Sequence, residues 1–155
     1  MLSTRQSRQL RVGRYSESGR IYLITSNTRD RQPIFGDLRI GHLVARQFME
    51  AEREGLVQSL AWVVMPDHFH WLLELKSGSL SQAVGLTKSL TCAAVNAAQG
   101  RTGRIWQQGF HDRAVRRDED LKALARYVVM TRCAQAWSSG LVIIRFGTLS
   151  GFSCS

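Results

Sequence analysis

The feature that most constrains the fold of this chain is a pair of apolar runs of strand length, residues 60–64 and 71–75. Both runs are rich in β-branched and aromatic residues, which is typical of buried strands. The Pro66-Asp67 step between them predicts a hairpin turn. The turn would place His68 at the very start of a central strand, where a polar side chain needs a physical reason.

His68 and His70 flank Phe69 at the head of this strand, and they are two of the four histidines in the chain. In a strand, residues i and i+2 project to the same face, so the two imidazoles should lie side by side while Phe69 packs on the opposite face. Two neutral imidazoles on a rigid strand can bind a divalent metal. An exposed surface pair is the alternative, and the apolar runs around the histidines favour the metal site.

Length and composition predict one globular domain. The chain has 155 residues, of which 44% are hydrophobic, and no apolar run reaches the roughly 18 residues of a membrane span. The first residues lack the apolar stretch of a secretory signal. Cys92, Cys133 and Cys154 lack the spacing of a zinc site or a disulfide framework. We therefore expect a cytoplasmic protein that has no membrane partner.

The formal net charge of +9 comes mainly from arginine. A planar guanidinium suits phosphate better than the point charge of lysine. Two separate arginine clusters favour a nucleic acid partner over a merely basic soluble surface, although charge alone does not separate DNA from RNA. Trp106 could stack on an unpaired base, and Phe110 could do so or join the core. The candidate DNA-binding residues are Arg5, Arg8, Arg11, Arg14, Arg104, Trp106, Arg113, Arg116 and Arg117.

Local signals predict the order strand, helix, two strands, helix, strand, helix. Asp37 can cap the first helix, and Ser79 or Ser81 can cap the second, which Gly100 ends. This order is that of a ferredoxin-like α+β fold, an antiparallel sheet with helices on one face, plus a C-terminal helix. The strands are expected at 20–26, 57–65, 68–75 and 110–115, and the helices at 38–54, 80–98 and 121–130. The apolar stripe of the first helix would be Leu38, Ile40, Leu43, Val44, Phe48 and Met49.

The last expected helix carries Tyr127. Most helical tyrosines only pack, but this one coexists with a metal-capable histidine pair and a basic surface. A phenolate that attacks a phosphodiester would form a 5′-phosphotyrosine while a 3′-hydroxyl leaves, and a metal would polarise the scissile phosphate. His111 lies in a basic strand, where DNA contact or packing suits it better than metal binding.

Several stretches of the chain together resemble a known family. Residues 63–75, which contain His-Phe-His, resemble the HUH motif of single-tyrosine transposases. Residues 13–16, 21–26 and 105–113 and the Tyr127 helix resemble one branch of that superfamily, the REP-associated tyrosine transposases, which nick single-stranded DNA beside short palindromic hairpins. The resemblance spans about residues 13–130, and the combination is specific although no single motif is.

This resemblance implies a ferredoxin-like fold, a Mg²⁺ or Mn²⁺ ion on His68 and His70, and Tyr127 as the catalytic nucleophile. It implies single-stranded or hairpin DNA as the partner, with a guide sequence read loosely by residues 5–15. We expect a monomer or a homodimer. Two other interpretations stay open: a non-catalytic protein that binds hairpin DNA, and an RNA-binding ferredoxin-like module without a metal.

The resemblance stops after Met130, so we expect a basic arm at 1–19, a transposase-like domain at 20–130 and an atypical tail at 131–155. The family continues with Asn-Pro, a variable pair and Ala-Gly-Leu-Val, whereas here Thr-Arg-Cys-Ala follows. With suitable synonymous codons, one base restored after the codon of Met130 makes the tail encode Asn-Pro-Val-Arg-Ala-Gly-Leu-Val. We therefore hypothesise a single-base deletion at codon 131. The nucleotide sequence decides, because the hypothesis fails if no one-base insertion there restores the motif.

Such a frameshift would weaken catalysis. The lost asparagine stands four residues after Tyr127, on the same face of the helix, where the resemblance implies a third metal ligand. Thr131 is a shorter side chain and a weaker metal donor. We therefore expect the chain to retain DNA binding, with cleavage weakened or absent. Metal-dependent nicking at ordinary rates would contradict this expectation.

Overall fold

The computed structural model describes residues 16–116, 121–126 and 143–146. Its centre is one antiparallel sheet with the strand order β4-β1-β3-β2-β5. A short helix at 121–126 follows β4. The other elements are β1 (Ile21–Asn27), the turns η1 (Arg29–Arg31) and η2 (Ile34–Gly36), α2 (Leu38–Arg53), β2 (Val57–Met65), β3 (His68–Leu75), α3 (Leu80–Gln99), β4 (His111–Ala114) and β5 (Ile143–Phe146).

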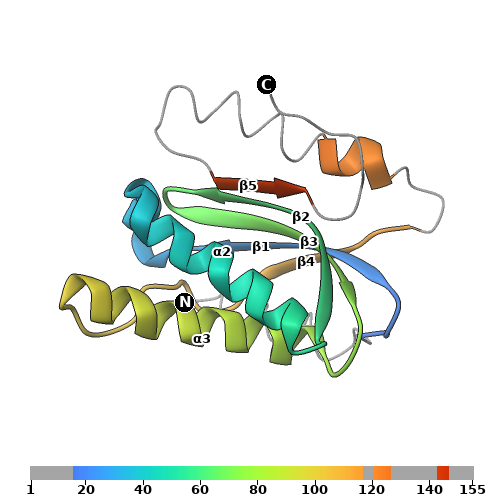
Figure 1. Cartoon of the computed structure of the whole chain (residues 1–155), viewed down its shortest axis with the longest axis horizontal. Coiled ribbons are helices and arrows are strands. Elements are labelled where there is room, and N and C mark those ends of the chain that lie inside the picture. Colours follow the sequence, from blue (N-terminus) through green and yellow to red (C-terminus); the bar gives the residue numbers. More distant parts are fainter. Residues whose placement is uncertain (1–15, 117–120, 127–142, 147–155) are drawn as a thin grey trace.

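The order of β1 to β4 around the central β3 confirms the ferredoxin-like α+β fold that the sequence predicts. The helices α2 and α3 cover one face of the sheet, as expected, and the helix at 121–126 lies on the other face (Figure 1). The expected end of that last helix, at 127–130, and the expected basic arm up to residue 15 lie outside the described residues. Within the described ranges, no helix has the length and apolar character needed to cross a membrane.

The helix α2 begins as predicted and buries Ile40, Val44 and Phe48 of the predicted stripe, but the two ends of that stripe are exposed. The side chain of Asp37 accepts a hydrogen bond from the backbone N–H of Arg39 and so caps the helix. Leu38 and Met49 were expected in the core, which is wrong, because they are 41% and 42% exposed. Small residues take their place in the core. A search for large apolar side chains does not detect such residues. The buried residues of α2 are Ile40, Gly41, Val44, Ala45, Phe48 and Ala51.

Phe48 joins α2 to the sheet. Its ring centroid lies 5.3 Å from that of Trp62, 5.0 Å from that of Phe69 and 4.4 Å from that of Trp71. All four side chains are at most 2% exposed. This aromatic cluster is the centre of the larger core, between the sheet and the two long helices.

The sequence left two candidates for the cap of α3, and the structure selects Ser79. Its hydroxyl accepts from the backbone N–H of Gln82, and the Gln82 side chain accepts from the backbone N–H of Ser79, which completes a capping box. Gly100 ends the helix in the left-handed conformation, with φ of 60°.

We expect Ser79→Ala to lower the free energy of unfolding by about 1 kcal/mol, because the backbone N–H of Gln82 loses its hydrogen-bond acceptor at the helix start. Ser81→Ala is the matched control. Ser81 is exposed inside the first turn, where alanine is the better helix former, so no loss is expected. Urea denaturation of the three proteins measures the difference, and equal midpoints would contradict the assignment of the cap.

The strand β5 is an element that the sequence analysis missed. It pairs antiparallel with β2, with Ile143 opposite Val64 and Phe146 opposite Ala61. Four residues are too few for an alternating pattern to stand out from an irregular segment. The strand lies within residues 131–155, the segment that the frameshift hypothesis concerns. That hypothesis is tested by the nucleotide sequence of the gene and not by the fold.

Candidate active site

The His-Phe-His tripeptide begins β3, the central strand, as predicted. His68 and His70 are each 8% exposed, and their ring centroids lie 5.1 Å apart with the ring planes at 82°. Phe69 is fully buried in the core under the long helices. The two imidazoles therefore lie side by side on one face while the intervening phenylalanine fills the other.

Asp67 fixes the orientation of His68. A hydrogen bond of 2.6 Å joins His68 Nδ1 to Asp67 Oδ1. A carboxylate only accepts hydrogen bonds, so a neutral His68 carries its proton on Nδ1 and the lone pair on Nε2. The other carboxylate oxygen accepts a 2.9 Å hydrogen bond from Arg31 Nε. Partial burial alone would raise the pKa of Asp67, but the hydrogen bonds with His68 and Arg31 outweigh it and lower the pKa.

His70 is held in a similar way by the neighbouring strand. Its Nδ1 lies 2.8 Å from the Oγ1 of Thr25, which is its partner on β1. Both imidazoles thus use Nδ1 inside the protein, so Nε2 is the atom that each would offer to a metal. Histidines that ligate metals are usually oriented by such a hydrogen bond through the other ring nitrogen.

The donor set fits a partial metal site. Two imidazole nitrogens suit Mn²⁺ better than Mg²⁺, which prefers oxygen ligands. Among the described residues, no group of three or more His, Cys, Asp and Glu side chains is placed to hold a metal ion. A metal on the two histidines would therefore need further ligands from another residue type, from DNA or from water.

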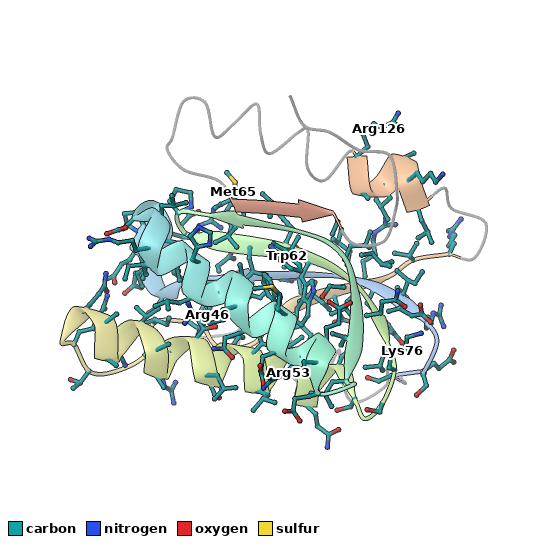
Figure 2. The ribbon with its side chains drawn as sticks, viewed as in Figure 1. Arg46, Arg53, Trp62, Met65, Lys76 and Arg126 are labelled. Carbon is teal, nitrogen blue, oxygen red and sulfur yellow. The ribbon has the colours of Figure 1, made fainter. Side chains whose placement is uncertain are left out.

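The helix at 121–126 covers the face that carries the histidines. Its Leu124 packs against Val63 and Met65, which are the β2 partners of His70 and His68. Figure 2 shows Met65 and the helix end at Arg126 on one side of the sheet and α2 on the other. Tyr127 is the next residue and lies outside the described residues, so its distance from the histidines stays a prediction.

The structure places some of the candidate DNA-binding arginines. Arg113 is exposed on β4, opposite Leu23, and so projects from the sheet face that carries the histidines. Arg104 and Arg116 are also exposed, before and after this strand. His111 is exposed and stands opposite Thr25, two strands away from His70. Arg5, Arg8, Arg11, Arg14 and Arg117 lie outside the described residues.

Trp106 is packed more tightly than a stacking platform would be. It is 7% exposed, and its ring lies 5.2 Å from that of Phe35 and 5.3 Å from that of Phe69. Its indole N–H donates a 3.0 Å hydrogen bond to the backbone oxygen of Lys88. This packing gives Trp106 a structural role, and base stacking by it stays a prediction. Phe110 is half-buried against the core.

Sequence reasoning missed the supporting residues Thr25, Arg31 and Asp67. Only Asp67 had a visible signal, because it precedes His68 directly. Thr25 contacts His70 from the neighbouring strand β1, and Arg31 contacts Asp67 from the turn η1, and no local pattern reports such contacts.

Comparison with known proteins now adds to this geometry. Residues 18–130 match the family model described as "Transposase IS200 like". The chain belongs to the IS200-like transposase family. The match ends at residue 130, where the resemblance in the sequence also stops. A comparison with the curated proteins finds no match for this IS200-like chain.

Two solved structures share the fold of this IS200-like transposase. A REP-associated tyrosine transposase bound to a REP hairpin is 24% identical, with a TM-score of 0.63 over 80% of this chain and 73% of that chain. A candidate transposase of Deinococcus radiodurans R1 is 14% identical, with a TM-score of 0.51 over 83% of this chain and 95% of that chain.

Proposed function

We propose that this transposase nicks single-stranded DNA at palindromic hairpins and transfers the strand through a 5′-phosphotyrosine on Tyr127. The observation that carries the proposal is the pair of oriented imidazoles, His68 and His70, on the sheet face that the helix leading to Tyr127 covers. The similar fold of a REP-associated transposase bound to a REP hairpin supports hairpin DNA as the substrate. We further propose that the altered segment after Met130 weakens cleavage.

Each group would have one task in the reaction. The Tyr127 oxygen would lose its proton and attack the phosphorus, the bond to the 3′-oxygen would break, and the strand would leave with a 3′-hydroxyl. Mg²⁺ or Mn²⁺ held by His68 and His70 would polarise the scissile phosphate. Asp67 and Thr25 keep the two imidazoles oriented. Arg113 projects from the same face and would bind the DNA backbone.

The test is incubation of the protein with the DNA hairpins that flank its own gene, with and without Mn²⁺, followed by denaturing electrophoresis. We expect a slowly formed covalent adduct that requires the metal. A frame-restored chain, made by inserting one base after the codon of Met130, should form the adduct faster. Hairpin binding without an adduct in either protein would favour the non-catalytic binder, and a preference for RNA would favour the RNA-binding module.

We expect Asp67→Ala to weaken Mn²⁺ binding by about 10- to 100-fold, the usual effect of removing a residue that orients a metal-ligating histidine. Asp37→Ala is the matched control, because it removes an equal charge from the start of α2. Titration with Mn²⁺, followed by its electron paramagnetic resonance signal, measures the affinity of each protein. Equal affinities in both variants would contradict the role of Asp67.

A further inference from the structure

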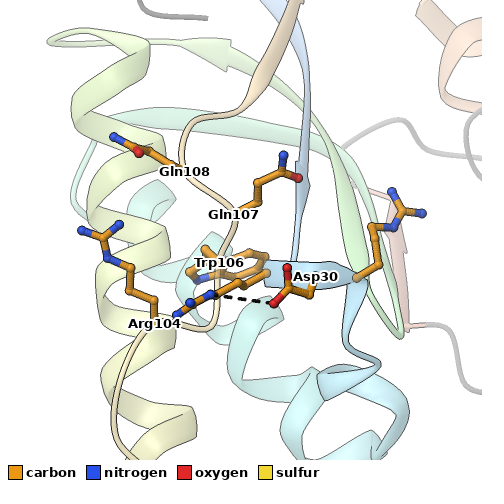
Figure 3. Close-up of a pocket in the computed structure, with 7 residues that line it drawn as sticks. Asp30, Arg104, Trp106, Gln107 and Gln108 are labelled. Carbon is orange, nitrogen blue, oxygen red and sulfur yellow. Dashed lines mark ion pairs between the residues drawn. The ribbon is translucent and has the colours of Figure 1, made fainter. Parts of the chain in front are cut away.

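A hollow of about 580 Å³ opens beside the end of β1. The turn after β1 forms one wall, and the segment that follows α3 forms the other (Figure 3). The residues that line it are Arg29, Asp30, Arg31, Arg104, Trp106, Gln107 and Gln108. Of these, only Arg104 and Trp106 were candidates for DNA binding from the sequence.

The first wall holds a strained shape. Asp30 and Arg31 are consecutive residues other than glycine with φ of 55° and 54°. This left-handed conformation costs free energy and persists where surrounding contacts impose it. Here the Arg31 guanidinium binds Asp67 at 2.9 Å, and the backbone N–H of Arg29 donates to the oxygen of Ile105 at 2.9 Å.

The second wall is tied to α3 and β1. The Nζ of Lys88 donates to the backbone oxygens of Gln107 at 3.0 Å and Gly109 at 2.6 Å. The backbone N–H of Gln107 donates to the oxygen of Asn27 at 3.0 Å. These hydrogen bonds to backbone groups therefore fix the segment, and the exposed residues Gln107 and Gln108 line the hollow.

The lining of the hollow suits a nucleotide. Arg29 and Arg104 are exposed cations, although the Nε of Arg29 lies 3.9 Å from the Asp30 carboxylate, and one guanidinium group can bind two phosphate oxygens at once. The amides of Gln107 and Gln108 present donors and acceptors, which can pair with the edge of a base. Pockets that enclose small ligands have volumes of roughly 300–1,000 Å³, so one nucleotide fits this hollow.

The hollow is also close to the candidate active site. Arg31 lies in its wall and donates to one oxygen of Asp67, while the other oxygen of Asp67 bonds to His68. One carboxylate group therefore separates the hollow from the first imidazole. A strand that runs from the two histidines past Asp67 and Arg31 would place a neighbouring nucleotide at this hollow.

We propose that this hollow binds one unpaired nucleotide of the DNA strand beside the nicking position, its phosphate on Arg29 and Arg104 and its base on Gln107 and Gln108. The proposal rests on the proposed function, and it names a subsite of that reaction. A paired base would have to leave its duplex to enter the hollow, so the subsite should select single strands.

The first test is binding of a labelled single strand of about 12 nucleotides, a length typical of single-strand sites, and of the corresponding duplex. We expect Arg104→Ala to weaken single-strand binding about tenfold, since a hydrogen bond to a charged group is usually worth that factor or more. The negative slope of log affinity against log salt concentration should become shallower by about 0.7, because the variant neutralises one phosphate fewer. Duplex binding should not change.

Arg46→Ala is the matched control, because Arg46 is an exposed arginine on α2 (Figure 2) and is not among the residues that line the hollow. It should change neither affinity nor salt slope. Equal losses for single strand and duplex in Arg104→Ala, or no loss at all, would overturn the proposal.

A second test identifies the nucleotide. In hairpins with a single-stranded extension, each extension base is replaced in turn by an abasic site. At one position, removal of the base should weaken binding to the parent chain. It should cause no further loss of affinity in Gln107→Ala or Gln108→Ala, because in a double-mutant cycle the losses from two groups in contact are not additive. Additive losses at every position would overturn the base contact.

Failure of the subsite and failure of the proposed function give different results. If no hairpin forms an adduct with any version of the chain, the nicking reaction is refuted, and the strand-binding results still stand. If an adduct forms but Arg104→Ala binds single strands like the parent chain, the subsite alone is refuted.

Discussion

Replacing Tyr127 with phenylalanine is expected to abolish the covalent protein–DNA adduct. Phenylalanine keeps the ring but has no oxygen to attack phosphorus, so no phosphotyrosine can form. Hairpin binding should stay within about twofold of the parent chain, because a single hydroxyl contributes little to an interface made mainly of phosphate contacts. The measurement is adduct formation on denaturing gels, for the chain as it stands and for the frame-restored chain.

The histidine variants should separate metal binding from DNA binding in the same assay. His68→Ala and His70→Ala are each expected to slow metal-dependent adduct formation at least about a hundredfold, since a bound metal contributes several kcal/mol of charge stabilisation. His111→Ala is the matched control, because His111 is exposed and two strands away from His70. An adduct that survives in Tyr127→Phe, or an equal effect of all three histidine variants, would contradict the proposed site.

Replacing Trp71 with alanine is expected to lower the free energy of unfolding by about 3–5 kcal/mol, a large fraction of the stability of a domain of this size. Trp71 is fully buried on the central strand, and its ring lies 4.4 Å from that of Phe48. Its indole N–H donates a 3.0 Å hydrogen bond to the buried hydroxyl of Ser59. Alanine would leave a cavity and also remove the partner of that hydroxyl.

Chemical denaturation in urea measures this loss. Trp71→Phe should cost less, because it keeps most of the ring. Leu90→Ala is the surface control: Leu90 is 39% exposed on α3, and its replacement should change stability by about 0.5 kcal/mol or less. If Trp71→Ala unfolded at the same urea concentration as the Leu90 variant, the aromatic cluster would not be the centre of the core.

Much of the fold could be predicted from the sequence because its signals are local. The apolar run along β3, the Asp37 cap and the glycine stop at Gly100 depend on neighbouring residues, so they can be read from a short window. The same applies to the pairing of His68 and His70, because the period of a strand alone puts them on one face.

The features that the sequence did not show depend on contacts between distant segments. The bond between Arg31 and Asp67 joins residues 36 positions apart, and β5 is defined by its pairing with β2. The burial of α2 followed small residues such as Gly41 and Ala45 rather than Met49, because shape and packing decide which face of a helix fits a sheet. Sequence periodicity carries no information on these points.

Successive side chains of β3 point to opposite faces of the sheet, so correct folding of this strand also positions the catalytic groups. If the strand slipped by one position against β1 and β2, Phe69 and Trp71 would turn away from α2 and α3, and two imidazoles would enter a dry aromatic interior. Such a misaligned molecule would lose the packing of its core and would also bury the two imidazoles away from the active-site face. A molecule of this chain that folds in the native register therefore already has both histidines on the active-site face. No separate rearrangement of the strand is needed before DNA binds.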